Sequence, residues 1–364
     1  MSSLPATLIP RNRHCCWHSV WQQGSGPGTC SRTSVPKGSP VDSLHSPLEL
    51  PPRLLIAGGG NAIHPEGIRG TAEEQMQTAA RAARTLLPIL ELERELIVTH
   101  GNGPGVGKTI MRQVLARHRV TPMSLDICVA NTQGVTAYLL MQAFENALRS
   151  AGDPRHAVGL VTQVEVDPED PAFQKPSKPV GYFYSEEEAR DLESERGWTM
   201  REDSGRGWRQ VVPSPEPRHI CDISLVDGLA SRGTIVIAGG GGGIPVVRDN
   251  HGVRHGIEAV IDKDLTSQHM ANVLGIKHIL ILTGVRNVSL HFGTPRQEEI
   301  GECAVSQMRQ YQSEGHFADG SMGPKVEAAV RFIERGGRRA IIGHLDEALP
   351  ALMGEAGTHI VADD

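Results

Sequence analysis

Short apolar runs that end in glycine recur along the chain. Residues 54–57 lead into Gly58-Gly-Gly60, residues 95–99 lead into the turn Gly101-Asn-Gly-Pro104, and residues 234–238 lead into a run of five glycines. Apolar runs of this length, bounded by turn residues, predict buried strands. A glycine after a strand leaves backbone N–H groups open to an anion, because no Cβ covers them.

Between these predicted strands, apolar residues recur at helical spacing. The pattern predicts helices over residues 72–90 and 125–148, and Thr71 with Glu74 forms a capping box at the start of the first. A strand, a helix and a second strand in succession predict a parallel, doubly wound sheet. We therefore expect an α/β fold that binds its ligands outside the carboxyl ends of the strands.

The rest of the chain continues this alternation. We expect further strands over residues 157–164, 234–238, 279–283, 289–292 and 358–361, and further helices after residue 258 and over residues 323–334. Residues 167–213 interrupt the pattern with proline-rich turns, a charged helix over 185–196 and an alternating hairpin over 197–212. This insertion predicts a small protruding lid that is not part of the main sheet.

The N-terminal residues 1–52 have a different composition, rich in Ser, Pro, Gly and Arg and poor in acids. This composition favours a disordered extension over an organelle-targeting peptide, which is the alternative. We therefore expect three parts: the extension over 1–52, an N-terminal lobe over 53–225 that includes the lid, and a C-terminal lobe over 226–364.

Charge and hydropathy exclude some partners. The formal net charge is −6 and the sequence pI is about 6.2, without a basic block, which argues against nucleic acid as a partner. No apolar run reaches the ~18–20 residues of a membrane span. The cysteines of the predicted folded part, Cys128, Cys221 and Cys303, lie far apart in sequence, and no signal-peptide pattern precedes them, so we expect a reduced, cytoplasmic compartment.

Three lysines lie beside turns rich in Gly, Pro or Asp. Lys178 lies between prolines, Lys263 lies between Asp262 and Asp264, and Lys325 opens a helix after a Gly-Pro pair. Phosphoryl transfer requires positioning and positive charge around the transferred group, and these lysines can supply both. Carboxylates on either side favour the charged form of Lys263. The residues alone therefore predict kinase-like phosphoryl transfer.

One known phosphate-binding motif, the P-loop, is matched only in part. Gly107-Lys-Thr109 matches the end of a P-loop, but the motif requires glycine at position 102, where this chain has Asn102. We interpret Lys108 as an exposed residue of a helix that runs to about Arg117.

Nine motifs in order resemble the carbamate kinases of the amino acid kinase superfamily. The resemblance covers residues 54–361 and rests on Gly59-Gly-Asn-Ala62, Thr99-His-Gly-Asn-Gly-Pro104, Thr132-Gln-Gly134, Val164-Glu-Val-Asp-Pro-Glu-Asp-Pro-Ala-Phe173, Lys178-Pro-Val-Gly181, Val211-Val-Pro-Ser-Pro-Glu-Pro217, Gly240-Gly-Gly-Gly-Ile-Pro245, Val260-Ile-Asp-Lys-Asp264 and Gly320-Ser-Met-Gly-Pro-Lys-Val-Glu-Ala328. The Pro-Ser-Pro-Glu-Pro run separates this branch from other amino acid kinases. Lys178 on the lid is the expected replacement for the first-strand lysine of those other kinases.

The resemblance implies a fold and a reaction. The fold would be a three-layer α/β/α sandwich around a mainly parallel open sheet. The lobe over 53–225 would bind carbamate and phosphate, and the lobe over 226–364 would bind the nucleotide. The reaction would be reversible phosphoryl transfer between ATP and carbamate, giving ADP and carbamoyl phosphate, and such enzymes usually run toward ATP at the end of arginine fermentation. Mg²⁺ would travel with the nucleotide rather than occupy a protein metal site, and the protein would be a homodimer.

The resemblance also implies roles for individual residues. The catalytic residues would be Lys178, Lys263, Lys325 and Asp264. The substrate-binding residues would be Gly59, Gly60, Asn61, Gly101, Asn102, Gly103, Gly241 and Gly242. The nucleotide would contact Asp262, Thr283, Val285, Ser321, Met322, Gly323 and Pro324.

Two departures from the family pattern keep one alternative open. Arg286 stands where a second acidic residue is usual, and Ser289 stands where an aromatic is common near the adenine. Both could weaken nucleotide binding. They motivate the alternative of a nucleotide-binding paralogue without turnover. A separate alternative is a kinase of another small carboxylate or amino acid on the same fold. An Arg or Lys cluster near Gly101-Asn-Gly-Pro104 would support it, and the sequence does not show such a cluster there.

Overall fold

The computed structural model describes residues 51–59, 69–92, 95–203, 206–318 and 322–363. The chain divides into two units, Met1–Ser46 and Pro47–Asp364, and all the described residues belong to the second. The expected extension over residues 1–52 falls almost wholly outside the described residues, as do three predicted site residues, Gly60, Asn61 and Ser321. The division into two lobes near residue 225 stays a prediction.

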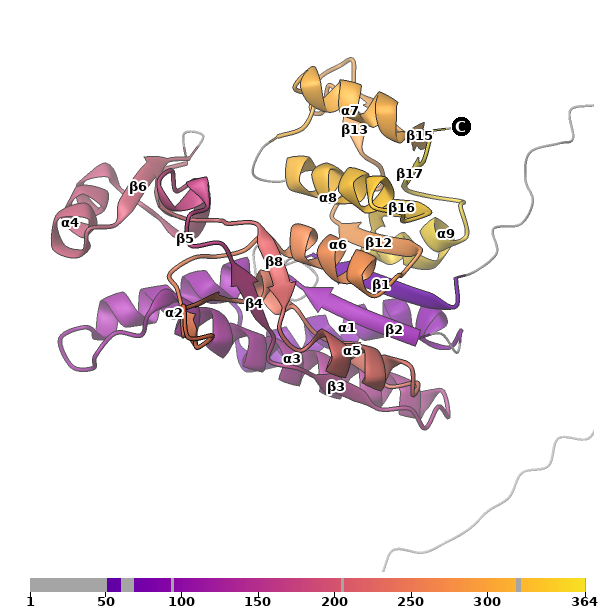
Figure 1. Ribbon diagram of the computed structural model, residues 1–364, viewed down its shortest axis with the longest axis horizontal. Helices are drawn as coiled ribbons and strands as arrows, with labels where there is room; N and C mark the ends of the chain where they lie inside the picture. The colour runs from indigo at the N-terminus through magenta and orange to yellow at the C-terminus, as the bar shows by residue number, and fades with distance from the viewer. Residues whose placement is uncertain (1–50, 60–68, 93–94, 204–205, 319–321, 364) are drawn as a thin grey trace, which may run out of the picture. The chain divides into compact units, whose positions relative to one another are not determined.

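A mainly parallel sheet of eight strands forms the centre of the second unit (Figure 1). Its strands, in order across the sheet, are β15 (Glu302–Ala304), β17 (Thr358–Val361), β16 (Arg339–His344), β12 (His278–Thr283), β1 (Arg53–Gly58), β2 (Glu95–His100), β9 (Ile235–Ile237) and β3 (Ala157–Gly159). Every neighbouring pair is parallel except β16 with β17. The carboxyl ends of β1, β2, β9 and β12 therefore lie at the same edge of the sheet.

Helices cover both faces of the sheet, because alternate strand residues are apolar on both sides. On one face the core includes Leu55, Ile97 and Ile281, which pack with α5 (Ile223–Ala230), α6 (Lys263–Val273), α7 (Val305–Ser313) and α8 (Met322–Glu334). On the other face, Ile56 and Val98 pack with α1 (Ala72–Leu90), α3 (Leu125–Ser150) and α9 (Ala348–Leu352). The predicted three-layer α/β/α fold is confirmed.

Residues 167–213, the predicted lid, contain a three-stranded sheet separate from the main one. The sheet has the order β5 (Lys178–Tyr184), β7 (Trp208–Val212), β6 (Thr199–Glu202), and α4 (Glu186–Arg196) packs with it. In this sheet, β6 and β7 pair as the expected hairpin. A 3-10 turn, η2 (Pro171–Phe173), precedes it. The lid docks on α2 (Gly103–Ala116), where an apolar cluster includes Val106 of α2, Val180 of β5 and Leu192 of α4.

The remaining strands form two smaller sheets. One has the order β11 (Arg254–Gly256), β10 (Ile244–Arg248), β4 (Gln163–Val166) and β8 (Pro217–Ile220), and the other pairs β13 (Ser289–Leu290) with β14 (Glu298–Glu299). Two further 3-10 turns are η3 (Gly240–Gly242) and η4 (Leu345–Glu347). In the described part of the chain, no helix has both the length and the apolar character that crossing a membrane requires.

Most predicted elements have the expected bounds, including α1 with its capping box of Thr71 and Glu74. Two strand predictions were wrong. The strand expected over residues 157–164 is two strands in different sheets, because Thr162 leaves the ladder to bond the backbone N–H of Gly239 and the side chain of Gln133. The strand expected over 289–292 ends at Leu290, because His291 has a positive φ of 49°.

Candidate active site

Two glycine-rich turns meet at the carboxyl edge of the sheet. The turn after β2 and the turn after β9 are in such close contact that a Cβ on Gly240 would overlap the His100 ring and a Cβ on Gly241 would overlap the Asn102 amide. Gly241 also has a positive φ of 63°, which favours glycine. After β1, a Cβ on Gly59 would lie 3.1 Å from the carbonyl oxygen of Leu282 at the end of β12. The approaches at Gly240 and Gly241 leave no room for a Cβ unless His100 and Asn102 shift, and the approach at Gly59 is tight.

Side chains of α3 and α6 hold the turn after β9. The amide nitrogen of Gln133 donates to the carbonyl oxygen of Gly240 at 2.8 Å, and the Thr266 hydroxyl donates to that of Gly242 at 2.8 Å. The Thr162 hydroxyl accepts from the N–H of Gly239 at 2.9 Å. Sequence reasoning missed Thr162 and Thr266 as supports of this turn. Neither has a local sequence signal, because each contacts the turn only through the tertiary fold.

Asn102 lies at the start of α2 and is almost fully buried. Its amide nitrogen donates to the Thr132 hydroxyl at 2.8 Å, and Thr132 donates in turn to the Val129 carbonyl at 2.7 Å. The flanking Gly101 and Gly103 keep this helix start free of side chains. The structure thus brings together the predicted substrate-binding residues of both turns: Gly101, Asn102, Gly103, Gly241 and Gly242.

The start of α6 carries the predicted charged residues. Asp262 caps the helix, because its Oδ1 accepts from the backbone N–H of Asp264 at 2.8 Å. Its other oxygen, Oδ2, lies 2.8 Å from Nζ of Lys178 on the lid strand β5. Asp262 therefore contacts the lid and stabilises the helix start at the same time.

Two more lysines converge on Asp264, whose side chain is only 3% exposed. Oδ1 lies 2.6 Å from Nζ of Lys263, and Oδ2 lies 3.2 Å from Nζ of Lys325 at the start of α8. The structure thereby gathers all three predicted lysines around two adjacent carboxylates. A buried carboxylate between two ammonium groups fixes their directions, and a phosphoryl group nearby would meet preoriented positive charge.

Burial and charge shift the ionisation of this cluster. Burial lowers the pKa of the Lys263 ammonium, against the opposing attraction of Asp264, and the neighbouring Lys325 lowers it further. Burial alone would raise the pKa of the Asp262 carboxyl, but the positive charges of Lys178 and Lys263 outweigh it, so that this pKa lies well below its usual range. The sequence predicted that the two neighbouring carboxylates would favour the charged form of Lys263. It did not include burial, which favours the neutral form and is the largest effect on this pKa.

His100 is a buried residue of the site that sequence reasoning did not single out. Burial, the largest cause, and the positive charge of Lys263 bring its pKa to about 4, against a hydrogen bond with the Gly101 carbonyl that raises it. The ring is therefore neutral at pH 7. Nδ1 lies 3.2 Å from the Gly101 carbonyl oxygen. Because a carbonyl oxygen can only accept a hydrogen bond, Nδ1 carries the proton of the neutral ring. The other ring nitrogen, Nε2, therefore has no proton, and it lies beside Gly240.

Apart from Asp262 at the start of α6 and Ser321, which lies outside the described residues, the residues expected to contact the nucleotide lie at two places in the fold. Thr283 ends β12 and Val285 follows it, whereas Met322, Gly323 and Pro324 form the first turn of α8. The N–H of Gly323 donates to the Ala318 carbonyl at 2.9 Å. An anion near this helix start would face backbone N–H groups and the positive end of the helix dipole.

Arg286 and Ser289, the two residues that depart from the expected family pattern, each contact another side chain of the protein. Arg286 Nε lies 3.1 Å from an oxygen of Glu347, and Ser289 is buried with its hydroxyl 3.5 Å from the Gln297 amide. Lys108, the residue of the incomplete P-loop, donates to the Arg69 carbonyl at 3.2 Å.

Comparisons with known proteins match this site and fold. The sequence profile described as the Amino acid kinase family matches residues 52–344. The carbamate kinase of Pyrococcus furiosus is 45% identical over 311 residues, which are 85% of this chain and 99% of the relative. The chain belongs to the amino acid kinase family and, within it, to the carbamate kinases.

Other carbamate kinases match over the same extent. The one from Trichomonas vaginalis is 43% identical over 311 residues, 85% of this chain and 99% of the relative. Among solved structures, the carbamate kinase from Giardia lamblia bound to AMP-PNP is 39% identical and superposes with a TM-score of 0.80, covering 85% of this chain and 98% of that one. A relative of the same fold therefore binds an ATP analogue.

Proposed function

We propose that this protein catalyses reversible phosphoryl transfer between ATP and carbamate, giving ADP and carbamoyl phosphate. The observation that carries the proposal is the convergence of Lys178, Lys263 and Lys325 on Asp262 and Asp264, beside the glycine turns. Membership in the carbamate kinases supports the choice of substrate. A transferred phosphoryl group needs positive charge around its oxygens and little covalent help from the protein.

Each group has a proposed role. Lys263 and Lys325 neutralise the transferred phosphoryl group, Asp264 orients both ammonium groups, and Lys178 reaches the phosphates from the lid. The backbone of Gly101, Asn102 and Gly103, with that of Gly241 and Gly242, forms the side of the site that holds carbamate. Gly59 is proposed to line the same side, and the substrate contacts of Gly60 and Asn61, which lie outside the described residues, stay a prediction.

The nucleotide is proposed to bind as its Mg²⁺ complex at the start of α8. Its contacts would come from Asp262, Thr283, Val285, Ser321, Met322, Gly323 and Pro324. Asp262 and Asp264 already contact lysines in the described structure, an arrangement that suits Mg²⁺ held mainly by phosphates and water.

We also propose the setting in which the enzyme works. The reaction would run toward ATP in arginine catabolism, by the arginine deiminase pathway, in the cytoplasm, with organelle targeting through residues 1–52 as the alternative. The protein would be a homodimer. Exposed apolar side chains on one face of α3, Ile127, Val135 and Tyr138, are the surface that a second copy would cover, and light scattering on the purified protein measures the oligomeric state.

Acceptor selectivity tests the proposed reaction. The purified protein, ADP and Mg²⁺ are mixed with carbamoyl phosphate or, separately, with acetyl phosphate, and ATP is measured. We expect faster ATP formation from carbamoyl phosphate. ATP formation only from the other acyl phosphate would favour a kinase of another carboxylate, and ADP binding without ATP formation from either would favour a paralogue without turnover.

A further inference from the structure

The Pro-Ser-Pro-Glu-Pro run has no role in the site as described so far. It is the segment by which the chain leaves the lid, between β7 and β8. Ser214 and Glu216 each precede a proline, which restricts both to extended backbone, and the prolines fix their own φ. The segment is therefore stiff, and Glu216 is held at a set place along it.

Glu216, in the segment that leaves the lid, contacts the segment that enters it. Its backbone N–H donates to Oδ2 of Asp170 at 3.0 Å, and Oδ1 of Asp170 accepts from the N–H of Ala172 at 2.9 Å. Asp170 is 9% exposed. The two segments that connect the lid to the main body are therefore joined at its base. Lys178 lies a few residues after the first of these segments.

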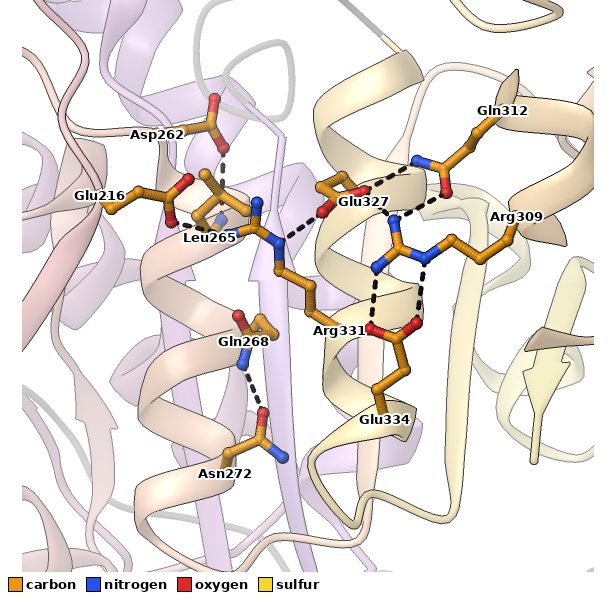
Figure 2. A network of polar contacts seen from close by, with 10 residues as sticks. All are labelled: Glu216, Asp262, Leu265, Gln268, Asn272, Arg309, Gln312, Glu327, Arg331 and Glu334. Atoms are coloured by element: carbon orange, nitrogen blue, oxygen red, sulfur yellow. Dashed lines mark hydrogen bonds and ion pairs between the residues drawn. The ribbon is translucent and has the colours of Figure 1, made fainter. Parts of the chain in front are cut away.

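The side chain of Glu216 reaches α8 (Figure 2). Its Oε2 lies 2.7 Å from Nη1 of Arg331, although 115 residues separate the two in sequence. Nε of Arg331 donates to Glu327 one turn earlier on the same helix, and Glu327 also accepts from Arg309 and Gln312 of α7. Arg331 thus bridges the base of the lid and a helix that is itself fixed to α7.

The same helix carries Lys325 at its first turn. Six residues separate Lys325 from Arg331, which is about 9 Å along an α-helix. A helix moves as a rigid element over this length. The position of the lid base relative to Arg331 therefore determines the position of Lys178 relative to Lys325.

We propose that Arg331 is a positioning residue for phosphoryl transfer, which holds the lid base through Glu216 so that Lys178 and Lys325 meet the same phosphate chain. The proposal rests on the phosphate-binding roles proposed above for these two lysines. No substrate contact is proposed for Arg331 or Glu216. Misplacement of reacting groups by about 1 Å can reduce a rate about a hundredfold, so loss of the bridge is expected to lower kcat.

Kinetics of Arg331→Met, Glu216→Gln and the double variant test the proposal. We expect each single variant to lower kcat for ATP formation from carbamoyl phosphate by roughly ten- to a hundredfold. ADP affinity, measured by calorimetry, should stay within twofold of the unmodified protein. The double variant should be no slower than the slower single variant, because both substitutions break one bridge.

A matched control separates positioning from stability. Glu334→Gln removes a carboxylate one turn further along α8 that contacts Arg309 at 2.8 Å and does not reach the lid. It should lower the melting temperature about as much as Glu216→Gln and leave kcat unchanged. Lower melting temperatures with unchanged kcat in all three bridge variants would overturn the proposal, and so would losses that multiply in the double variant.

Amide hydrogen exchange provides a readout without turnover. ADP should slow exchange in the lid strands β5 and β7 of the unmodified protein, and this slowing should be lost in Arg331→Met. Equal slowing in both proteins would overturn the positioning role. If the unmodified protein makes no ATP from carbamoyl phosphate, the proposed function fails, and the exchange experiment still decides on the Arg331 bridge.

Discussion

Nζ of Lys178 lies 2.8 Å from Oδ2 of Asp262, although 84 residues separate the two in sequence. Lys178 begins the lid strand β5, and Asp262 caps α6 with its other carboxylate oxygen. One carboxylate therefore fastens the lid and stabilises the start of the helix that carries Lys263 and Asp264. The lid and the charged cluster depend on the same side chain.

Two replacements of Asp262 separate these functions. Asp262→Asn keeps a good helix cap but removes the charge that attracts Lys178, so we expect faster amide exchange in β5 with little change in melting temperature. Asp262→Ala removes the cap as well and should cost about 1 kcal/mol more of unfolding free energy. Exchange in β5 of Asp262→Asn equal to that of the unmodified protein would show that the ion pair does not hold the lid.

Gly107 lies where α2 crosses the lid strand β5. A Cβ at this position would lie 2.9 Å from the Cα atom of Gly181, and backbone cannot move aside as a side chain can. Gly107→Ala should therefore lower the free energy of unfolding by about 1–3 kcal/mol. Urea unfolding measures the change.

Gly228 in α5 is the matched control. A Cβ there meets no atom within 4 Å, so Gly228→Ala should raise the free energy of unfolding by about 0.5–1 kcal/mol. A Gly107→Ala protein as stable as the Gly228→Ala protein would contradict the close crossing of α2 and β5.

His278 is a buried histidine at the start of β12, and its Nδ1 has no hydrogen-bond partner among the described residues. Burial, with the positive charges of Arg338 and Arg339, lowers its pKa to about 4. Between pH 6.5 and 4 the unfolded chain therefore binds a proton that the folded protein does not bind. Stability is retained above pH 6.5 and falls as the pH drops toward 4, by about 2 kcal/mol at pH 5 from this residue.

His278→Leu removes this proton and the unpartnered nitrogen. Between pH 7.5 and 5 the free energy of unfolding of the His278→Leu protein, measured with urea, should fall by about 2 kcal/mol less than that of the unmodified protein. Parallel pH dependences for the two proteins would show that His278 does not stay neutral on folding.

Local patterns were sufficient to predict much of the fold. The helix α1, its capping box and the apolar strands each depend on residues close in sequence, so their bounds could be predicted. The lysines were singled out by their Gly, Pro and Asp neighbours. The Thr162 support and the bridge from Glu216 to Arg331 could not be found this way, because each joins distant segments and requires the tertiary fold.

Arg286 departs from the family pattern, and the structure indicates a small effect on the nucleotide. Its side chain is 58% exposed and contacts Glu347, and an exposed ion pair contributes at most about 1 kcal/mol. Arg286→Ala should change ADP affinity, measured by calorimetry, by less than about fivefold. A change of a hundredfold would place Arg286 in direct contact with the nucleotide.

Replacement of Lys263 tests the proposed transfer mechanism most directly. ATP formation from carbamoyl phosphate, ADP and Mg²⁺ is measured for the unmodified protein, for Lys263→Ala and for Lys175→Ala, an exposed lysine at the lid entry that serves as the control. Loss of a preoriented charge should lower kcat of Lys263→Ala by about 10³-fold, and the control should retain full activity. A loss of less than about tenfold in Lys263→Ala, with the unmodified protein active, would contradict the role of the lysine cluster in phosphoryl transfer.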